Sequence, residues 1–191
     1  MKTPLTLLGA ALLAACLGAC GVGPKAQAPV GTYDFGLAAE AAPRLALKTI
    51  GQVEVGAPRW LDSVNLYYRL AYADIAQPRA YTQTRWSMPP ASLVEARFKE
   101  RAVAGGAVIG GSGPTVRIEI DEFSQVFTTA TSSKAVLRAR VSVLGGPGTT
   151  VRQKAFAVEE PAASADGPGG AAALKRAAEG LVDAALAWAG E

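Results

Sequence analysis

Apolar and polar residues alternate along much of the chain, which is the pattern of β-strands that bury one face. The alternation is clearest over 64–72 and over most of 115–129. In the second of these segments it changes phase near Glu122-Phe123, which predicts a β-bulge. A turn is predicted at Ala76-Gln77-Pro78, because proline interrupts strand pairing. Further strands are predicted at 32–37, 45–55, 79–87, 108–109, 135–144 and 150–158.

Other segments have the period of an amphipathic helix. One begins at Pro89-Pro90, ends at Gly105-Gly106 and places Val94, Phe98 and Ala102 on one face. Strands that need a cover, together with helices that have one apolar stripe, predict an α+β fold. We expect a two-layer domain whose mostly antiparallel sheet is covered by two main helices. The remaining predicted elements are a helical turn over 58–62, a loop over 162–170 and a second helix over 171–189.

The N-terminal segment has the three parts of a secretory signal: a positive charge at Lys2, an apolar run over 5–20 and small residues at its end. The run is shorter than the roughly 20 residues of a membrane-spanning helix. We therefore predict a signal peptide over 1–19, a lipidated cysteine with a flexible tether over 20–31, and one domain over 32–191.

Both cysteines of the chain, Cys16 and Cys20, lie at the end of the apolar run. Each follows a Leu and two small residues and so resembles the bacterial lipobox, whose cysteine is acylated and becomes the mature N-terminus. Cys20 is the preferred lipidation site because it gives the longer apolar run and precedes a Gly-Val-Gly-Pro tether. Cys16 follows the more usual small pair and stays an alternative.

Composition excludes several classes of function. The net charge is only +3, and the basic residues are not gathered into a cluster, so nucleic acid is not an expected partner. The chain contains no histidine, which removes the commonest general base and metal ligand and excludes a Ser-His-Asp triad. With its thiols confined to the N-terminus, we expect no metal and no other cofactor. The protein is predicted not to be an enzyme.

One pair of carboxylates has a catalytic interpretation. Glu119 and Asp121 lie on the same face of a predicted strand, about 7 Å apart, which is the range of an inverting glycosidase pair. Arg117 shares that face, and Arg138 and Arg140 are expected opposite, so a cross-strand charge ladder explains the pattern better.

Two further patterns have simpler structural interpretations. The glycine-rich stretch 105–113 lacks the Lys-Ser/Thr pair and the following helix of a phosphate loop, so we expect a helix stop and a turn. Ser132 and Ser133-Lys134 are expected to form a hairpin tip rather than a Ser-Lys catalytic pair.

Aromatic residues are concentrated over 60–86. Packing within a sheet explains most of this concentration. A surface that faces a partner or lipid is the alternative, because aromatic residues and arginine are enriched at interfaces. The candidate contact residues are Trp60, Tyr81, Arg85 and Trp86.

The order of these motifs is similar to that of a known family. A strand leads into a Trp60-Leu61-Asp62 turn, Arg85-Trp86-Ser87 precedes the two prolines of the first helix, and a strand with Glu122-Phe123 opens a meander before the last helix. Over about residues 30–190 this order resembles the ABC-type transport auxiliary lipoprotein family, the relatives of paraquat-inducible protein C. The chain departs from the family at Ser63, where proline is usual, and in its Ala/Gly-rich loops.

The resemblance implies a non-enzymatic periplasmic lipoprotein that is an auxiliary subunit of an ABC transporter. Its implied partners are a mammalian-cell-entry-type substrate-binding subunit and the ABC permease and ATPase, in a system that moves phospholipid or other hydrophobic molecules between membranes. Self-association into a homo-oligomer stays open. Only Cys20 carries over as a functional residue.

The implied location is the periplasmic face of the outer membrane, since Gly21 rather than Asp follows Cys20; the inner membrane is less favoured. A different class of function also stays open, that of an envelope assembly lipoprotein that binds an outer-membrane barrel or a polymer synthase.

Overall fold

The computed structural model describes residues 29–37, 46–146 and 149–191. The predicted signal peptide, both cysteines, most of the tether and the loop at 38–43 lie outside these ranges. Within them, no helix is both long and apolar enough to cross a membrane. The same residues contain no group of His, Cys, Asp and Glu that could hold a metal ion.

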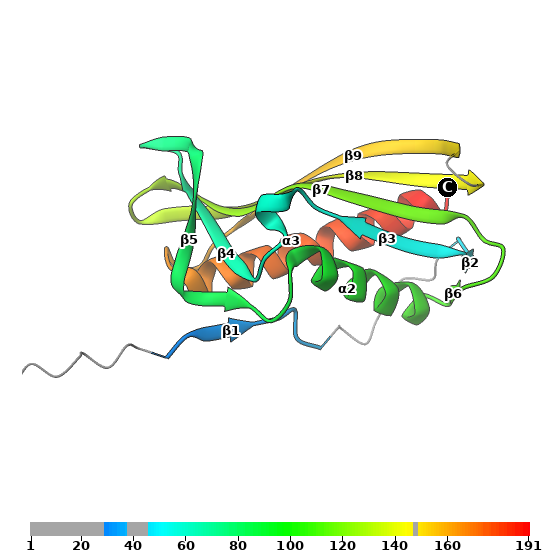
Figure 1. Cartoon of the computed structure of the whole chain (residues 1–191), viewed down its shortest axis with the longest axis horizontal. Coiled ribbons are helices and arrows are strands. Elements are labelled where there is room, and N and C mark those ends of the chain that lie inside the picture. The colour runs from blue at the N-terminus through cyan, green and yellow to red at the C-terminus, as the bar shows by residue number, and fades with distance from the viewer. Residues whose placement is uncertain (1–28, 38–45, 147–148) are drawn as a thin grey trace, which may run out of the picture.

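The domain has two layers, which confirms the predicted α+β fold. Helices α2 (Pro90–Ala104) and α3 (Gly167–Ala189) lie side by side on one face of a 7-stranded sheet (Figure 1). In the described part of the chain no helix covers the opposite face, which we call the open face. The strands of this sheet are β1 (Gly31–Tyr33), β3 (Gln52–Gly56), β4 (Asn65–Leu70), β5 (Asp74–Trp86), β7 (Thr115–Thr129), β8 (Ser132–Gly146) and β9 (Thr149–Pro161).

The sheet is mixed. Its strand order is β1-β5-β4-β7-β8-β9, and the pairs β4–β5, β7–β8 and β8–β9 are antiparallel as expected. Strand β7 also has two parallel neighbours, because β3 pairs with its first half and β4 with its last residues. β1 pairs in parallel with β5. These parallel pairs join segments far apart in the sequence, so no local pattern predicts them.

The predicted β-bulge is present, since the β7–β8 register shifts between Ile120 and Glu122. After the bulge, Phe123 belongs to the hydrophobic core under the helices. Glu122 and Val126 line a concavity on the open face instead. The extra residue in β7 therefore decides which side chains reach that face.

The turn predicted at 76–78 is wrong. The hairpin turns between Leu70 and Asp74, and β5 continues through Pro78. The β4–β5 register shifts between Tyr68 and Leu70, so residues 75–78 have no regular partner on β4. Proline is tolerated at such an irregularity because no ladder hydrogen bond is lost there.

Other boundaries also differ from prediction, and the strand expected over 32–37 is only β1 (Gly31–Tyr33). The strand expected over 45–55 is broken at Gly51 into β2 (Thr49–Ile50), which pairs with β6 (Val108–Ile109), and β3. A Cβ at Gly51 would lie 2.2 Å from the carbonyl oxygen of Gly113, so the chain passes too close there for a side chain. Helix α3 begins at Gly167 rather than at 171, because Asp166 caps it by accepting a hydrogen bond from the Gly169 N–H.

Candidate functional site

A concavity lies on the open face of the domain, beneath the tip of the β4–β5 hairpin. In Figure 1 this hairpin rises from the sheet on the side away from the helices. The space between the hairpin and strands β7–β9 has a volume of about 500 Å³ and is open to solvent. We call it the hairpin groove. Its lining residues are Arg69, Ala71, Ile75, Glu122, Val126, Thr128, Lys134, Val136, Arg138 and Glu159.

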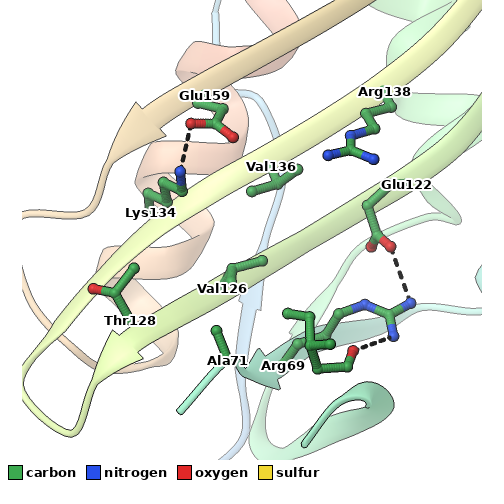
Figure 2. A pocket seen from close by; sticks show the side chains of 10 residues that line it. Arg69, Ala71, Glu122, Val126, Thr128, Lys134, Val136, Arg138 and Glu159 are labelled. Atoms are coloured by element: carbon green, nitrogen blue, oxygen red, sulfur yellow. Dashed lines mark hydrogen bonds and ion pairs between the residues drawn. The ribbon is translucent and has the colours of Figure 1, made fainter.

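Strand register explains why the lining residues share one face. Glu122 lies opposite Arg138, and Val126 lies opposite Lys134, in the antiparallel β7–β8 pair. Val136 in turn lies opposite Glu159 of β9. Because side chains alternate along a strand, residues two apart on each strand point to the same side. The result is an apolar floor of two valines with charged residues around it (Figure 2).

Arg69 holds the hairpin in place over the groove. Its Nη2 lies 2.9 Å from Glu122 Oε2, and its Nη1 donates hydrogen bonds of 3.1 and 3.3 Å to the carbonyl oxygens of Ile75 and Ala76. Its guanidinium also stacks 5.1 Å from the centre of the Trp60 ring, in the 3-10 turn η1 (Arg59–Leu61). These contacts join β4, β5, β7 and η1, so Arg69 fixes the groove wall.

Of the remaining charged residues of the groove, Lys134 and Glu159 form an ion pair, and Arg138 forms none within the described part of the chain. Lys134 Nζ lies 2.5 Å from Glu159 Oε2. Arg138 extends its guanidinium beside Val136 and has no hydrogen bond or ion pair with any residue that the structure describes (Figure 2). Arg140, two residues further along the same strand, makes hydrogen bonds of 2.9 and 3.2 Å to Asp121. Among the residues that the structure describes, Arg138 is therefore a groove cation without a protein partner.

Three buried side-chain atoms on this side of the sheet also lack a partner among the described residues. They are Arg69 Nε, Glu122 Oε1 and Ser124 Oγ. Ser124 is fully buried and lies opposite Val136, between Glu122 and Val126 on the same strand. Buried polar atoms usually have a hydrogen-bond partner, so this concentration is unusual.

A smaller depression of about 310 Å³ adjoins the hairpin groove. It shares Thr128, Lys134 and Glu159 with the groove and adds Pro161 at the end of the edge strand β9. The concave surface thus runs from the hairpin across β7 and β8 to the edge of the sheet.

The four candidate contact residues from the sequence do not form one surface. Trp60 contacts Arg69 and Tyr67 beside the groove. Trp86 is 1% exposed and packs against Phe35 and Phe123, so its ring belongs to the core and is not available to a partner.

The other two candidates have different settings. Tyr81 is half-buried and hydrogen-bonded inward, as described below. Arg85 is exposed, and its Nε lies 3.3 Å from the Thr32 hydroxyl at the β1 edge. Tyr81 and Trp86 are therefore explained by packing within the sheet. The alternation of residues along the strand does not by itself distinguish such buried positions from contact positions.

The predicted cross-strand charge ladder is present on the open face, in the form of two ion pairs. Arg140 binds Asp121, and Arg117 Nε lies 2.7 Å from Glu54 Oε2 on β3. Hydrogen bonding to Asp121 raises the pKa of Arg140. Asp121 is thus committed to an ion pair, which supports the ladder over a catalytic carboxylate pair. The ladder does not include Arg138, which lies opposite Glu122 without pairing to it.

The glycine-rich stretch is a helix stop followed by turns, as expected. Gly106, Gly110 and Gly111 have φ angles of +88°, +116° and +79°. Glycine adopts these left-handed conformations without strain. Ser133 belongs to the start of β8, where its hydroxyl accepts a hydrogen bond from Gln125.

A buried polar network lies on the helix side of the same strands. The Tyr81 hydroxyl donates a 2.9 Å hydrogen bond to Gln125 Oε1, and Gln125 Nε2 donates a 2.7 Å bond to Ser133 Oγ. Burial raises the pKa of Tyr81 above its ordinary value, with smaller contributions from Tyr68 and Asp166. The folded protein therefore keeps this phenol neutral at a pH where an unfolded chain ionises it.

This shift predicts a pH-dependent stability. Above about pH 10 the unfolded state loses the Tyr81 proton and the folded state keeps it, so the free energy of unfolding falls as pH rises. Tyr81→Phe should cost about 1 kcal/mol at pH 8 through the lost hydrogen bond. The deficit should shrink at pH 11, as measured by urea unfolding at both values. Tyr72→Phe, at an exposed tyrosine, is the control, and an unchanged Tyr81→Phe deficit at pH 11 would contradict the prediction.

The sequence indicated no site at the hairpin groove. Its lining residues come from three separate segments, around 69–75, 122–138 and 159. The available signal was the bulge at Glu122-Phe123, which places a carboxylate out of step with the alternation. That signal becomes informative only when the position of β4 is known.

Comparison with solved structures shows the same fold in other proteins. Protein XCC0632 from Xanthomonas campestris, described as a DUF330 protein, is 18% identical with a TM-score of 0.68, over 85% of this chain and 92% of that one. A second structure, of an uncharacterized protein, is 12% identical with a TM-score of 0.56, over 83% and 95% of the two chains. A search of curated proteins finds no match.

A family model gives a more specific result. The model described as the ABC-type transport auxiliary lipoprotein component matches residues 35–185, which is most of the chain and includes the hairpin groove. The chain therefore belongs to the family of ABC-type transport auxiliary lipoprotein components.

Proposed function

We propose that this protein is the lipid-anchored auxiliary subunit of an ABC transport system of the mammalian-cell-entry type. The observation that carries the proposal is the family match over residues 35–185. In the proposed system the protein works with a substrate-binding subunit of the mammalian-cell-entry type, an ABC permease and an ATPase. The cargo is phospholipid or another hydrophobic molecule that passes between the two membranes.

The proposed role is that of a binding subunit rather than an enzyme. The chain contains no histidine, and Asp121 of the conspicuous carboxylate pair is bound by Arg140. The described residues instead form a mixed-charge groove that includes the exposed, unpaired Arg138, which suits a contact site. We propose that the domain functions by contact with other subunits.

The anchor is proposed to be Cys20, with Cys16 as the alternative. Acylation at this position would hold the domain at the periplasmic face of the outer membrane through the short tether that follows. One acyl chain binds a membrane only marginally, whereas the several chains of a mature lipoprotein bind firmly.

Substitution of the anchor gives a direct prediction. Cys20→Ala should move the protein from the membrane fraction to the soluble periplasmic fraction, and Cys16→Ala should leave it in the membrane fraction. Cell fractionation measures the distribution, and mass spectrometry of the mature N-terminus identifies the acylated residue. The reverse pattern would assign the anchor to Cys16, and membrane retention of the double variant would contradict lipid anchoring.

Affinity purification of the acylated protein tests the proposed transport role. Solubilised membranes should yield the permease, the ATPase and the mammalian-cell-entry subunit together with it. Recovery of an outer-membrane barrel or a polymer synthase without any transporter subunit would overturn the proposal in favour of envelope assembly.

A further inference from the structure

The hairpin groove presents a specific set of unfilled interactions. The Arg138 guanidinium is exposed and has no acceptor among the residues that the structure describes. It borders the apolar floor formed by Val126 and Val136. Arg69 Nε and Glu122 Oε1 also lack partners among those residues, but both atoms are buried. A ligand that fits the exposed surface of the groove must therefore combine an anion with an apolar surface.

We propose that the hairpin groove binds an extended, acidic peptide segment of a partner subunit. A carboxylate of that segment pairs with Arg138, because guanidinium and carboxylate match in two parallel hydrogen bonds. Small apolar side chains of the segment lie on the two valines, Val126 and Val136. This proposal rests on the proposed function, since it names the surface through which an auxiliary subunit contacts its transporter.

The length of the groove suits a short extended chain. Neighbouring strands lie about 4.8 Å apart, so the path from β4 across β7 and β8 to β9 is roughly 14 Å. An extended peptide rises about 3.3 Å per residue, so about four residues span this path. Because successive side chains of an extended segment point to opposite sides, alternating acidic and apolar residues match the charged rim and the apolar floor.

The same dimensions disfavour a phospholipid. The hydrocarbon core of a bilayer is about 30 Å thick, so each acyl chain is roughly 15 Å long. The groove is open to solvent, and its floor has only Val126 and Val136 beside the wall residues Ala71 and Ile75. Sites for small ligands enclose most of the ligand surface, and this groove cannot enclose two acyl chains.

Arg138 and Arg140 provide a matched pair of variants for a test. Both are exposed arginines on β8 that face the open side, but only Arg138 lines the groove, and Arg140 is bound to Asp121. The full-length mature protein, purified in detergent, is titrated to about 1 mM against fluorescein-labelled peptides of four to eight residues. One set alternates Asp or Glu with Val, and the control set replaces the acidic residues with Lys.

Fluorescence anisotropy should show binding of the acidic peptides and none of the basic ones. Arg138→Gln should weaken binding about tenfold or more, the effect of losing one charge-assisted bidentate contact. Arg140→Gln should change it less than about twofold, in line with the small energies of surface ion pairs. Urea unfolding of both variants establishes that each remains folded.

The inference would be overturned if no acidic peptide binds, or if the Arg138 and Arg140 variants weaken binding equally. It would also be overturned if phosphatidylglycerol vesicles displace the peptide from the wild-type protein and their own binding is weakened to the same degree by Arg138→Gln. Self-association that Arg138→Gln abolishes would assign the groove to a second copy of this chain instead. The titration needs no transporter, so its failure is separable from failure of the affinity purification.

Discussion

Arg97→Met should lower the free energy of unfolding by about 3 kcal/mol, as the loss of a buried, fully bonded charge does. Arg97 lies on α2 with only 3% of its side chain exposed. It donates hydrogen bonds of 2.8 and 2.7 Å to the carbonyl oxygens of Phe35 and Gly36, and it pairs with Glu179 of α3 at 2.5 Å. One side chain thus joins the N-terminal segment to both helices.

The physical reason for the large effect is the state of the groups that remain. Methionine retains most of the volume but leaves the buried Phe35 carbonyl oxygen without its donor, which costs about 1–3 kcal/mol. The Gly36 carbonyl also loses its donor, but Gly36 is exposed and water can replace part of that bond. Glu179 is partly exposed and keeps a weak contact with Lys175 at 3.9 Å, so its own contribution to the loss is smaller. The N-terminal segment over 29–37 should loosen first.

Urea unfolding followed by tryptophan fluorescence measures the change, and hydrogen exchange of residues 29–37 shows whether the N-terminal segment is released. Lys99→Met is the matched control on the same helix, because Lys99 forms an exposed pair with Glu95 and should change stability by less than about 0.5 kcal/mol. A loss below about 1 kcal/mol for Arg97→Met, with unchanged exchange, would show that the contact does not hold the segment.

Gly170→Ala should lower the free energy of unfolding by about 2–3 kcal/mol, even though alanine is the better helix former. A Cβ at Gly170 would lie 2.0 Å from Gln125 Oε1, the acceptor of the Tyr81 hydrogen bond. Gln125 is fully buried, so its side chain has no free space into which to move. The substitution must either shift α3 away from the sheet or break the Tyr81–Gln125–Ser133 network.

Gly180 on the same helix provides a control, for which the same substitution should change the free energy of unfolding in the opposite direction. The nearest atom to a Cβ at Gly180 is Val158 Cγ1 at 3.7 Å, an ordinary contact. Gly180→Ala should therefore raise the free energy of unfolding by about 0.5–1 kcal/mol, the difference between glycine and alanine in a helix interior. If urea unfolding shows the same change for both variants, close packing at Gly170 is not the cause.

The start of α3 is a feature that the sequence did not predict correctly. Glycine and proline at 167–170 resemble a loop, and the helix was expected only from 171. Gly167 and Gly170 are instead required because Thr84 and Gln125 of the sheet lie against their backbone at distances that exclude a Cβ. Asp166 and Pro168 are residues typical of a helix start and so favour a helix from 167. The three glycines beside them favour a loop instead, and the prediction followed the glycines.

The same contrast applies to the charged residues. Arg97 lies beside the apolar stripe of its helix, and nothing in its immediate neighbours distinguishes it from the exposed Lys99. Its burial depends on Phe35 and Glu179, which are 62 and 82 residues away in sequence. The hairpin groove likewise depends on Arg69 meeting Glu122, a contact between two strands that pair in parallel.

The sequence by itself determined most of the elements, the two-layer α+β class, the bulge at Glu122-Phe123 and the family. Each of these depends on periodicity or on motifs within a short stretch of chain. Only the tertiary structure decided that Trp86 is core and that Arg97 joins three segments. It also decided that Arg138 borders a groove and has no partner within the described part of the chain. Those properties arise from strand order and register between distant segments, which local alternation does not encode.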